Sequence, residues 1–391
     1  MSAMKIGLVC PYIMARGGGV QEIVRDYYRE LVALGHDVRI ITPRPQEDGD
    51  HYDKDGIIFL GNGTDFSFAA FQTTPTFSVS VDPAEIDAML VKEKFDILHF
   101  HEPWVPILSR QILSRSKAIN IATFHANLPD SVMSRTIAKV VTPYTKSVLK
   151  YLHALTAVSE AAAQYINSLT DEPVTIIPNG INLKHFKTLK HVATSKDKPK
   201  TILYLGRLEQ RKGPKYLLKA YAELVKNQQD VELIIAGKGT ERERLEAMVK
   251  ELELPNVKFL GYVSDEEKLE LFQSADLYCS PATHGESFGL VLLEAMACGL
   301  VTIAGDNPGY LAVMKETGAL SIVNPRETDE FARRLAMLLN EEALRADWKK
   351  WAKEYIKQFD YPAIIKRYEL LYQQALKNHP HRIKPFDDDE A

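Results

Sequence analysis

The sequence predicts an α/β protein built from two doubly wound, Rossmann-like domains. Short apolar runs alternate with helical patterns along most of the chain. Many of these runs are continuous rather than alternating, as in parallel strands that are buried on both faces. The pattern stops once, at Leu189–Lys200, where lysines and a proline replace the apolar residues, and then starts again. Strand–helix alternation predicts βαβ units with right-handed crossovers on each side of this interruption.

The first half, residues 1–188, is expected to form the N-terminal domain. It opens with a strand at Lys5–Val9, a glycine loop and a helix at Gln21–Leu34 that ends at Gly35. Further apolar runs predict its other strands at Val38–Thr42, Ile57–Leu60, Ile97–Phe100, Ile121–Phe124, Leu155–Val158 and Val174–Ile177.

After a linker at residues 189–200, the alternation predicts a C-terminal domain over residues 201–360. Residues 361–378 form an amphipathic pattern with Pro362 near its first turn, and this helix is expected to pack back toward the N-terminal domain. Residues 379–391 end in four acidic residues and predict a disordered tail. The strands expected in the C-terminal domain are Thr201–Leu205, Glu232–Ala236, Val257–Leu260, Leu277–Ser280 and Leu300–Ala304.

The composition is that of an ordinary globular protein. The 391 residues are 45% hydrophobic and 26% charged, and their formal net charge of −4 argues against a nucleic-acid partner. Cys10, Cys279 and Cys298 lack metal-type spacing and predict reduced thiols. The sequence shows no leader, and the longest apolar stretch, Leu290–Ile303, is too short for a membrane span. A cytoplasmic protein is expected, with peripheral contact at the inner face of the membrane left open.

The most informative motif runs from Gly285 to Glu294. It joins a loop to the start of a helix, so that backbone N–H groups and the positive end of the helix dipole face the loop. These groups favour a phosphate, and the carboxylates of Glu286 and Glu294 beside them can accept hydrogen bonds from hydroxyl groups. The motif therefore predicts a site for a sugar nucleotide.

A glycine-rich loop, Arg16–Gln21, follows the first strand and opens a helix. Its three glycines allow the backbone to approach an anion closely. A nicotinamide dinucleotide site is not predicted, because Glu22 stands where the third glycine belongs and Thr42-Pro43 replaces the acid that ends the second strand. A glycine turn without a ligand is the alternative for this loop.

A basic loop, Gly206–Gly213, follows a strand at the edge where open α/β sheets bind ligands. It is not a P-loop, since it lacks the glycine before the lysine and the hydroxyl after it. Arg207 and Lys212 are suited to clamp a diphosphate leaving group, and a solvated basic loop is the alternative. Gly237-Lys238-Gly239 is a partial match only and predicts a strand-to-helix turn.

Three histidines, His99, His101 and His125, lie at or just after apolar strands. A zinc site is not predicted, because no third ligand lies at short spacing. His99 is typical of a polar residue that ends a strand. His101 and His125 fall at the expected ligand edge of the sheet, so contact with a ligand and a structural role are both open.

These features together resemble the retaining glycosyltransferases of family 4. The resemblance extends from about Lys5 to Ala375 and is strongest to phosphatidylinositol mannosyltransferases. It implies the GT-B architecture, in which two Rossmann-like domains face a deep interdomain cleft. Beside the motifs above, it rests on His101-Glu102-Pro103, Thr123-Phe124-His125, Pro178-Asn179-Gly180 and the Val263, Asp265, Lys268 stretch.

The resemblance also implies a role for each matching residue. Four residues are expected to be catalytic: His125, Arg207, Lys212 and Glu286. The residues expected to bind the donor are Gly18, Gly19, Val263, Asp265, Lys268, Ser287, Phe288, Gly289, Leu290 and Glu294. Those expected near the acceptor are Gln21, Asn62 and Thr64.

Asp265 guides the expected choice of donor. A carboxylate suits the two donor groups on the edge of guanine, whereas uracil offers one imide donor. GDP-mannose is therefore the preferred donor, and a UDP-sugar is the next choice. The resemblance implies a front-side, retaining reaction of the hexosyltransferase type, in which Arg207, Lys212 and helix dipoles stabilise the leaving diphosphate. No metal and no cofactor are expected.

The expected acceptor is a hydroxyl group of a lipid or a polyol. The lipid-specific relatives carry an arginine in a stretch that here reads Gly61–Phe68 and contains none, and Asp82–Asp87 after it is acidic. Phenylalanines near this stretch and basic residues across Ser109–Leu152 are compatible with a membrane surface, but packing of the phenylalanines and a solvated, basic helix face are the favoured interpretations.

Three other functions stay open at this point. One is a glucosyl or N-acetylglucosaminyl transferase of the same family that uses a UDP-sugar. Another is a sugar-nucleotide epimerase of similar architecture, which would convert the donor without an acceptor. The third is a nucleotide-sugar binding module that turns over no donor.

Overall fold

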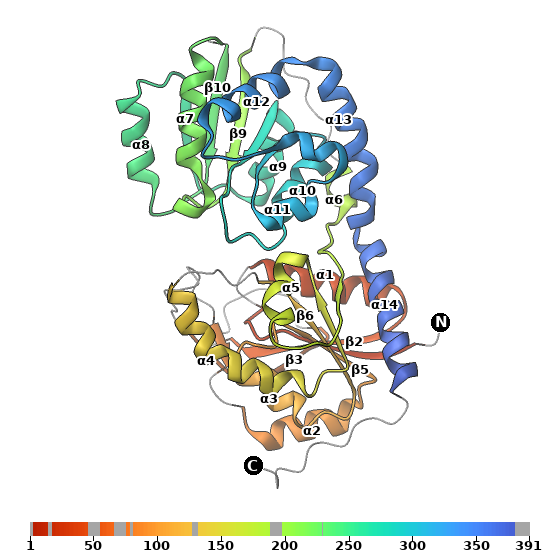
Figure 1. Cartoon of the computed structure of the whole chain (residues 1–391). Coiled ribbons are helices and arrows are strands. Elements are labelled where there is room, and N and C mark those ends of the chain that lie inside the picture. The colour runs from red at the N-terminus through yellow and green to blue at the C-terminus, as the bar shows by residue number, and fades with distance from the viewer. Residues whose placement is uncertain are drawn as a thin grey trace. The chain divides into compact units, whose positions relative to one another are not determined.

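The computed structural model of the chain describes residues 3–14, 18–45, 55–65, 76–78, 81–126, 132–187, 198–228 and 230–379. The chain forms two compact units. The first unit combines Met1–Gly180 with Tyr361–Ala391, and the second unit is Ile181–Asp360. Each unit is an α/β body in which helices surround a twisted sheet (Figure 1).

The first unit contains an eight-stranded sheet in the order β4-β3-β2-β1-β5-β6-β7-β8. Neighbouring strands are parallel, except that β3 and β4 are antiparallel. The continuous apolar runs of the sequence form these strands, and β5 and β6 are buried throughout. The strands are β1 (Lys5–Val9), β2 (Asp37–Arg44), β3 (Ile57–Asp65), β4 (Thr76–Ser78), β5 (Ile97–His101), β6 (Ile119–Phe124), β7 (Ala154–Ala157) and β8 (Val174–Ile176).

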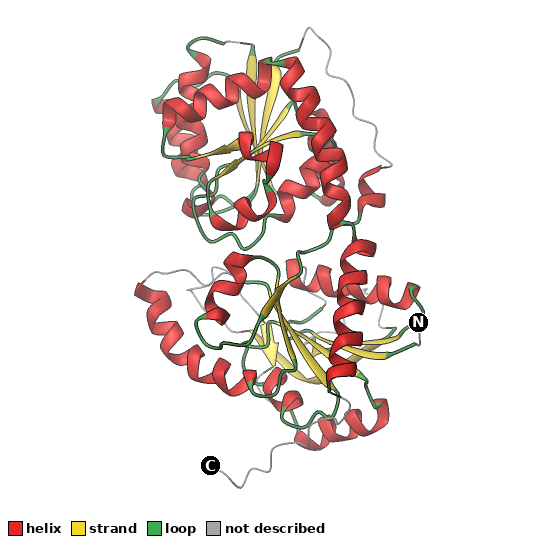
Figure 2. Cartoon of the chain, turned by 45° about the vertical axis from the view of Figure 1, so that its right-hand side comes forward, coloured by secondary structure: helices red, strands yellow, loops and turns green. Residues whose placement is uncertain are grey.

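Helices cover both faces of this sheet (Figure 2). Two of them begin at side-chain caps: Asp82 accepts the backbone N–H of Ala84 before α2, and Ser159 accepts that of Ala162 before α5. The final helix, α14, packs against α1. The helices of this unit are α1 (Gly19–Ala33), α2 (Pro83–Glu93), α3 (Leu108–Leu113), α4 (Val132–Leu149), α5 (Glu160–Asn167) and α14 (Tyr361–Asn378).

The second unit contains a six-stranded parallel sheet in the order β11-β10-β9-β12-β13-β14. This is a doubly wound order whose direction reverses between β9 and β12, and ligands of such sheets bind outside the carboxyl ends of the strands at that point. The strands are β9 (Lys200–Leu205), β10 (Val231–Ala236), β11 (Val257–Gly261), β12 (Leu277–Ser280), β13 (Val301–Gly305) and β14 (Ile322–Val323).

The helices of the second unit follow its strands, as βαβ units require. One of them, α9, starts with a capping box in which Ser264 and Glu267 satisfy each other's backbone N–H groups. The helical segments are α6 (Leu183–Lys187), η2 (Gln210–Lys212), α7 (Pro214–Val225), α8 (Arg242–Glu251), α9 (Asp265–Ser274), α10 (Leu290–Ala297), α11 (Pro308–Val313), η3 (Glu316–Ser321), α12 (Thr328–Asn340), α13 (Glu342–Tyr355) and η4 (Ile356–Phe359).

The units divide at points that differ from the expected boundaries. The first unit ends at Gly180 rather than at residue 188, because Ile181 forms a bridge with Asp360 and α6 packs against α10. The helix expected at 361–378 is α14, and it belongs to the first unit. Residues 189–197 of the expected linker and 380–391 of the expected tail lie outside the described residues.

None of the helices in the described ranges combines the length and the apolar character needed to cross a bilayer.

Candidate active site

Two loops of the second unit meet at the carboxyl ends of β9 and β12, where the strand order reverses. The first loop starts at Gly206 and leads through η2, and the second starts at Pro281 and leads to α10. Gly213, at the end of η2, has a φ of 72°, and a β-carbon there would collide with the carbonyl oxygen of Pro281. The two loops therefore lie against each other, and this approach requires glycine.

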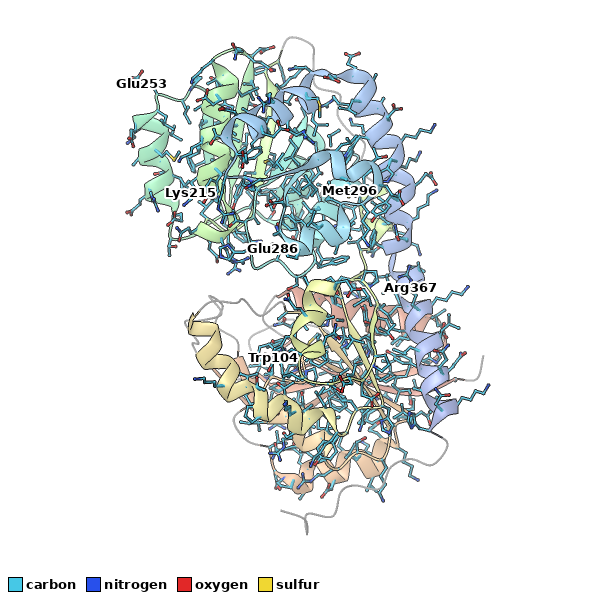
Figure 3. All side chains as sticks on the ribbon, viewed as in Figure 1. Trp104, Lys215, Glu253, Glu286, Met296 and Arg367 are labelled. Atoms are coloured by element: carbon cyan, nitrogen blue, oxygen red, sulfur yellow. The ribbon has the colours of Figure 1, made fainter. Side chains whose placement is uncertain are left out.

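A row of alternating charges crosses these loops. The Glu209 carboxylate accepts from Arg207 at 2.6 Å and from Arg211 at 3.0 Å. Oε1 of Glu286, labelled in Figure 3, accepts from Arg211 at 2.6 Å and from Lys212 at 2.8 Å. Three positive and two negative side chains leave one net positive charge in the row. Because the cations are already held in place, an anion that binds here meets a pre-arranged positive site.

Solvent exposure varies along this charge row. The side chain of Arg207 is 43% exposed, whereas those of Lys212 and Glu286 are 17% and 12% exposed. Ion pairs that are largely withdrawn from water are screened less than exposed pairs. The Lys212–Glu286 end is therefore the electrostatically stronger end, and Arg207 faces solvent.

The structure brings three of the residues predicted to be catalytic into this row. Lys212 contacts Glu286 directly, and Arg207 is connected to them through Glu209 and Arg211. The sequence analysis assigned no role to Glu209 or Arg211. A local signal was available, since both residues belong to the basic loop that contains Arg207 and Lys212, and charges of opposite sign alternate along it.

The start of α10 adds a second positive feature to the same loops. Gly289 precedes the helix with a φ of 109°, and a β-carbon there would collide with the ring of Tyr310. No side chain among the described residues caps this helix. Its first turn therefore directs backbone N–H groups and the positive dipole end toward the loop that contains Glu286.

The donor residues of this loop contribute differently. The side chain of Phe288 is 4% exposed and packs edge-on against Phe359, with ring centroids 5.9 Å apart. Because its ring belongs to the core of the second unit, Phe288 can offer a ligand only its backbone. Ser287 is half-buried, and Gly289 and Leu290 form the helix start described above.

Glu294 belongs to a separate charged cluster rather than to the row that contains Glu286. Its Oε1 lies 3.3 Å from Nζ of Lys268, which also lies 3.1 Å from Asp265. Burial alone lowers the pKa of Lys268, but the charges of Glu294 and Asp265 outweigh it, and the net pKa is raised. Asp265 is 82% exposed, and Val263 lies just before α9. Three predicted donor residues thus form one ion-paired group beside the end of β11.

The histidines of the first unit form a buried polar chain. His99 is bonded through Nδ1 to the Tyr372 hydroxyl at 2.8 Å and through Nε2 to the Thr123 hydroxyl at 2.6 Å. His101 and His125 share a hydrogen bond of 2.9 Å, and their rings stack. Burial lowers the pKa of His99 to about 3 and that of His125 to about 4, with Asn179 acting in the opposite direction on His125. All three histidines are therefore neutral at physiological pH, since burial also lowers the pKa of His101.

The predicted glycine loop is described in part. Gly18 precedes α1 and Gly19 is its first residue, but Arg16 and Gly17 lie outside the described residues. Gln21 is half-buried, and its amide oxygen lies so close to Gly18 that a β-carbon there would touch it. The predicted acceptor residues Asn62 and Thr64 lie on β3, and their side chains are outside the described part of the chain.

Comparison with known proteins decides the family. Residues 17–185 match Glycosyltransferase Family 4, and residues 186–355 match the group 1 glycosyl transferases. A phosphatidyl-myo-inositol mannosyltransferase of Mycobacterium leprae is 30% identical over 372 residues, which cover 95% of this chain and 96% of that enzyme. The chain belongs to glycosyltransferase family 4. A second enzyme with the same name, from Mycolicibacterium smegmatis, is also 30% identical and covers 95% of this chain and 94% of its own length.

Solved structures agree on the fold of this family 4 glycosyltransferase. A sucrose-phosphate synthase from Thermosynechococcus elongatus superposes with a TM-score of 0.76 at 23% identity, covering 96% of this chain and all of the other. A glycosyltransferase from Rickettsia africae gives 0.74 at 18% identity and covers 97% and 100%. The predicted GT-B class with two Rossmann-like domains is confirmed, as is the prediction of a hexosyl-transferring enzyme. The roles assigned to single residues stay predictions.

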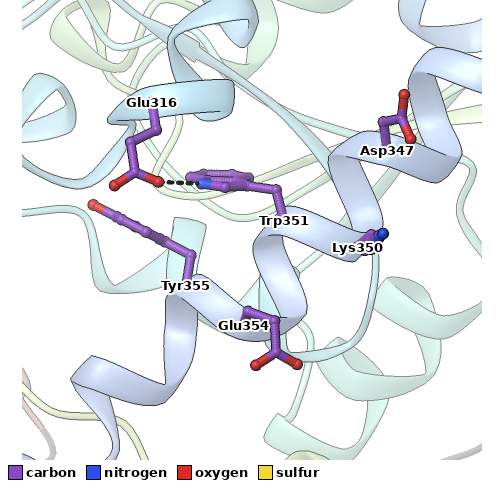
Figure 4. A pocket seen from close by; sticks show the side chains of 6 residues that line it. All are labelled: Glu316, Asp347, Lys350, Trp351, Glu354 and Tyr355. Atoms are coloured by element: carbon purple, nitrogen blue, oxygen red, sulfur yellow. Dashed lines mark hydrogen bonds between the residues drawn. The ribbon is translucent and has the colours of Figure 1, made fainter.

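The glycosyltransferase also has a surface pocket of about 500 Å³ between α13 and η3 (Figure 4). Trp351 donates its indole N–H to Glu316 at 3.0 Å and stacks on Tyr355, with ring centroids 4.6 Å apart. Tyr355 contacts Phe359, which in turn packs on Phe288. The aromatic rings of this pocket thus contact, through Phe359, the ring of Phe288 in the loop that contains Glu286. Its lining residues are Glu316, Asp347, Lys350, Trp351, Glu354 and Tyr355.

Proposed function

We propose that this glycosyltransferase transfers mannose from GDP-mannose, with retention, to a hydroxyl group of an inositol-containing lipid or a related polyol. The two relatives that match this chain over nearly its whole length are both named phosphatidyl-myo-inositol mannosyltransferase, and the proposal takes the sugar and the acceptor from that name. One structural observation carries the proposal. Arg211 and Lys212 converge on one oxygen of Glu286, beside the start of α10.

This arrangement suits the departure of a diphosphate. As the bond between the anomeric carbon and the diphosphate oxygen breaks, negative charge develops on the phosphates. Lys212, Arg207 and the N–H groups at the start of α10 would stabilise that charge. Glu286 would then accept hydrogen bonds from sugar hydroxyls while its pairing with Arg211 holds it in place.

The bond to the acceptor would form on the face from which the diphosphate departs. The acceptor hydroxyl oxygen bonds to the anomeric carbon, and its proton passes to the leaving diphosphate oxygen. This step needs no protein nucleophile and no redox partner. We propose that it also needs no metal ion, because the cationic row and the helix dipole act on the same leaving group.

The preference for guanine rests on the cluster beside α9. Asp265 is 82% exposed, so its carboxylate is accessible to the N1–H and amino groups of the base. Lys268 is held by Asp265 and Glu294. In the proposed complex, the Glu294 carboxylate would accept a hydrogen bond from a ribose hydroxyl. A UDP-sugar is the second choice, because uracil presents one such donor.

A thermal-shift screen of GDP-, UDP- and ADP-sugars tests the donor, since selective binding raises the melting temperature. GDP-mannose should give the largest shift. Radiolabelled GDP-mannose with phosphatidylinositol vesicles should then yield a mannosylated lipid, with equal yield after treatment with EDTA. Loss of transfer on chelation, restored by magnesium or manganese, would refute metal independence.

Other outcomes would redirect the proposal. A shift with UDP-sugars alone would favour the transferase that uses UDP-sugars. Isomerised free sugar from donor in the absence of any acceptor would favour the epimerase. Binding without turnover across a broad panel of acceptors would favour the binding module.

A further inference from the structure

Glu102 is a buried carboxylate at the ligand edge of the first sheet. It follows the last residue of β5 and is 1% exposed. Its Oε1 accepts the backbone N–H of His125 at 2.7 Å and that of Ala126 at 2.6 Å. Its other oxygen accepts the indole N–H of Trp104, which is labelled in Figure 3. One side chain thus fastens the first two residues that follow β6.

The backbone around Glu102 fixes this direction. Its φ is 51°, a left-handed conformation that residues with a β-carbon rarely adopt. Its N–H donates to the Thr123 carbonyl at 2.9 Å, and its own carbonyl accepts the N–H of Val105 at 3.0 Å. An unfavourable conformation that is bonded on both sides is typical of a functional site, where the surrounding structure holds the strain.

We propose that Glu102 is a positioning residue that, as a carboxylate, sets the place of His125 at the carboxyl edge of the first sheet. The proposal rests on the proposed function in one respect, namely that His125 is catalytic, as the family resemblance implies. Glu102 itself need not touch the substrate. It acts by holding the loop in which His125 begins, and the His101–His125 hydrogen bond then orients the imidazole from β5.

Among the described residues, the groups around Glu102 offer it hydrogen bonds, and none adds an opposite charge. The described titratable groups nearest to it are Tyr12 from the loop after β1, His101 at the end of β5 and His125 after β6. Burial raises the pKa of Tyr12 and lowers the pKa of both histidines, so all three are neutral near pH 7. Burial likewise raises the pKa of Glu102 to about 7, although its three hydrogen bonds oppose the shift.

The ionisation of Glu102 therefore falls near neutral pH. Above about pH 7 the carboxylate is charged, and hydrogen bonds to a charged acceptor are roughly twice as strong as neutral ones. Below that pH the proton weakens the hold on His125 and Ala126. The rate of transfer should therefore rise with pH through this range. The free energy of unfolding should change in the opposite direction, because the raised pKa means that the folded protein favours the protonated, uncharged carboxyl group.

The test compares Glu102→Gln with Glu93→Gln, which neutralises another buried carboxylate of the first unit. Glutamine keeps an oxygen for the two backbone N–H groups but removes the charge. We expect kcat of Glu102→Gln to fall about 10-fold at pH 8 with a largely unchanged KM for the donor, and to lose its dependence on pH between about 6 and about 9. Glu93→Gln should retain the wild-type pH profile.

A second readout requires no substrate and so separates this proposal from the proposed function. The backbone amides of His125 and Ala126 should exchange with deuterium about 10-fold faster or more in Glu102→Ala than in the wild type. If this variant does not fold, exchange at the same two amides can be measured in Glu102→Gln at pH 8. Exchange should again be faster than in the wild type, but by a smaller factor. A wild-type pH profile in Glu102→Gln, or unchanged exchange at both amides, would overturn the proposal. Failure of transfer from GDP-mannose with accelerated exchange would overturn only the proposed function.

Discussion

Each of the two sheets has a doubly wound strand order, but the carboxyl edges of the two sheets differ in electrostatics. At the edge of the first sheet, His99, His101, Glu102 and His125 are at most 7% exposed. They interact through hydrogen bonds with a hydroxyl group, with each other and with backbone amides. At the edge of the second sheet, the charge row from Arg207 to Glu286 holds its charges by pairing them, and its members are 12% to 43% exposed.

The difference shows how one fold can supply two chemical environments. Desolvation at the first edge favours the uncharged form of each group, which lowers the pKa of the histidines and raises that of Glu102. Pairing at the second edge holds cations in place where, under the proposed function, a diphosphate would carry its charge. Under the proposed function, a first edge with neutral histidines would suit a sugar, and a cationic second edge would suit a leaving group.

Removing a cation of the charge row should produce the largest effect. Lys212→Ala and Arg207→Ala should each lower kcat/KM about 100- to 1000-fold, or about 3 to 4 kcal/mol, because the proposed function has each cation stabilise charge that develops in the transition state. Steady-state kinetics with the donor identified by the thermal-shift screen would measure this. Unchanged far-UV circular dichroism and melting temperature would show that the fold is intact.

Arg242→Ala serves as the matched control for these variants. Arg242 also lies in the second unit and pairs with a carboxylate, Glu246, at 2.8 Å, but it is 40% exposed on α8 and lies outside the charge row. Its removal should change kcat/KM by less than about 2-fold, as expected for an exposed ion pair. Equal losses in Arg242→Ala and Lys212→Ala would show that the charge row contributes no more to activity than an exposed ion pair of the same unit.

Arg211 should have the next largest effect, although it was not among the predicted catalytic residues. It donates to Glu209, to Glu286 and, at 3.3 Å, to the carbonyl oxygen of Gly285. Arg211→Ala should lower kcat/KM about 30-fold, or about 2 kcal/mol, because the Glu286 loop loses its bridge while Lys212 stays in place.

Arg211→Lys sharpens this prediction. A lysine carries the same charge but lacks the planar fork that serves several acceptors at once, so it should restore little of the lost activity. Full rescue by lysine would mean that Arg211 contributes charge alone and that the geometry of the row is unimportant.

The sequence predicted most of the fold because buried parallel strands leave a strong local signal. Each expected strand is present within a few residues of its predicted range. The strands β4 and β14 were not predicted, since they contain three and two residues and no apolar run that short is distinctive. The separation of the units at Gly180 depends on contacts of Ile181 with residues near Asp360, and such distant pairings leave no local pattern.

The candidate site was predicted where residue type and spacing carry the chemistry. Lys212 and Glu286 were found this way, and the structure joins them at 2.8 Å. Arg211 was missed because one of its two carboxylate partners, Glu286, lies on another loop, and its pairing with Glu209 within the basic loop was not considered. The contacts of Glu102 were missed for a different reason. Its partners are backbone N–H groups, which every residue except proline has, so no sequence motif marks them.

The smallest expected effect lies at the first edge and concerns stability rather than rate. Tyr372→Phe removes the hydroxyl that is bonded to Nδ1 of the buried, neutral His99 and leaves this nitrogen without that partner. We expect a loss of about 1 to 2 kcal/mol in the free energy of unfolding, seen as a fall of about 3 °C in the melting temperature.

Tyr262→Phe is the control for this change, because Tyr262 is 72% exposed and its hydroxyl can bond to water in either state. It should leave the melting temperature within about 1 °C of the wild type. Because α14 places Tyr372 against His99 and not against the His101–His125 pair, kcat/KM of Tyr372→Phe should stay close to the wild-type value. A loss of activity at unchanged stability would mean that the hydrogen bond from Tyr372 to His99 affects the position of His101 and His125. The first edge would then contribute to the chemistry as directly as the charge row.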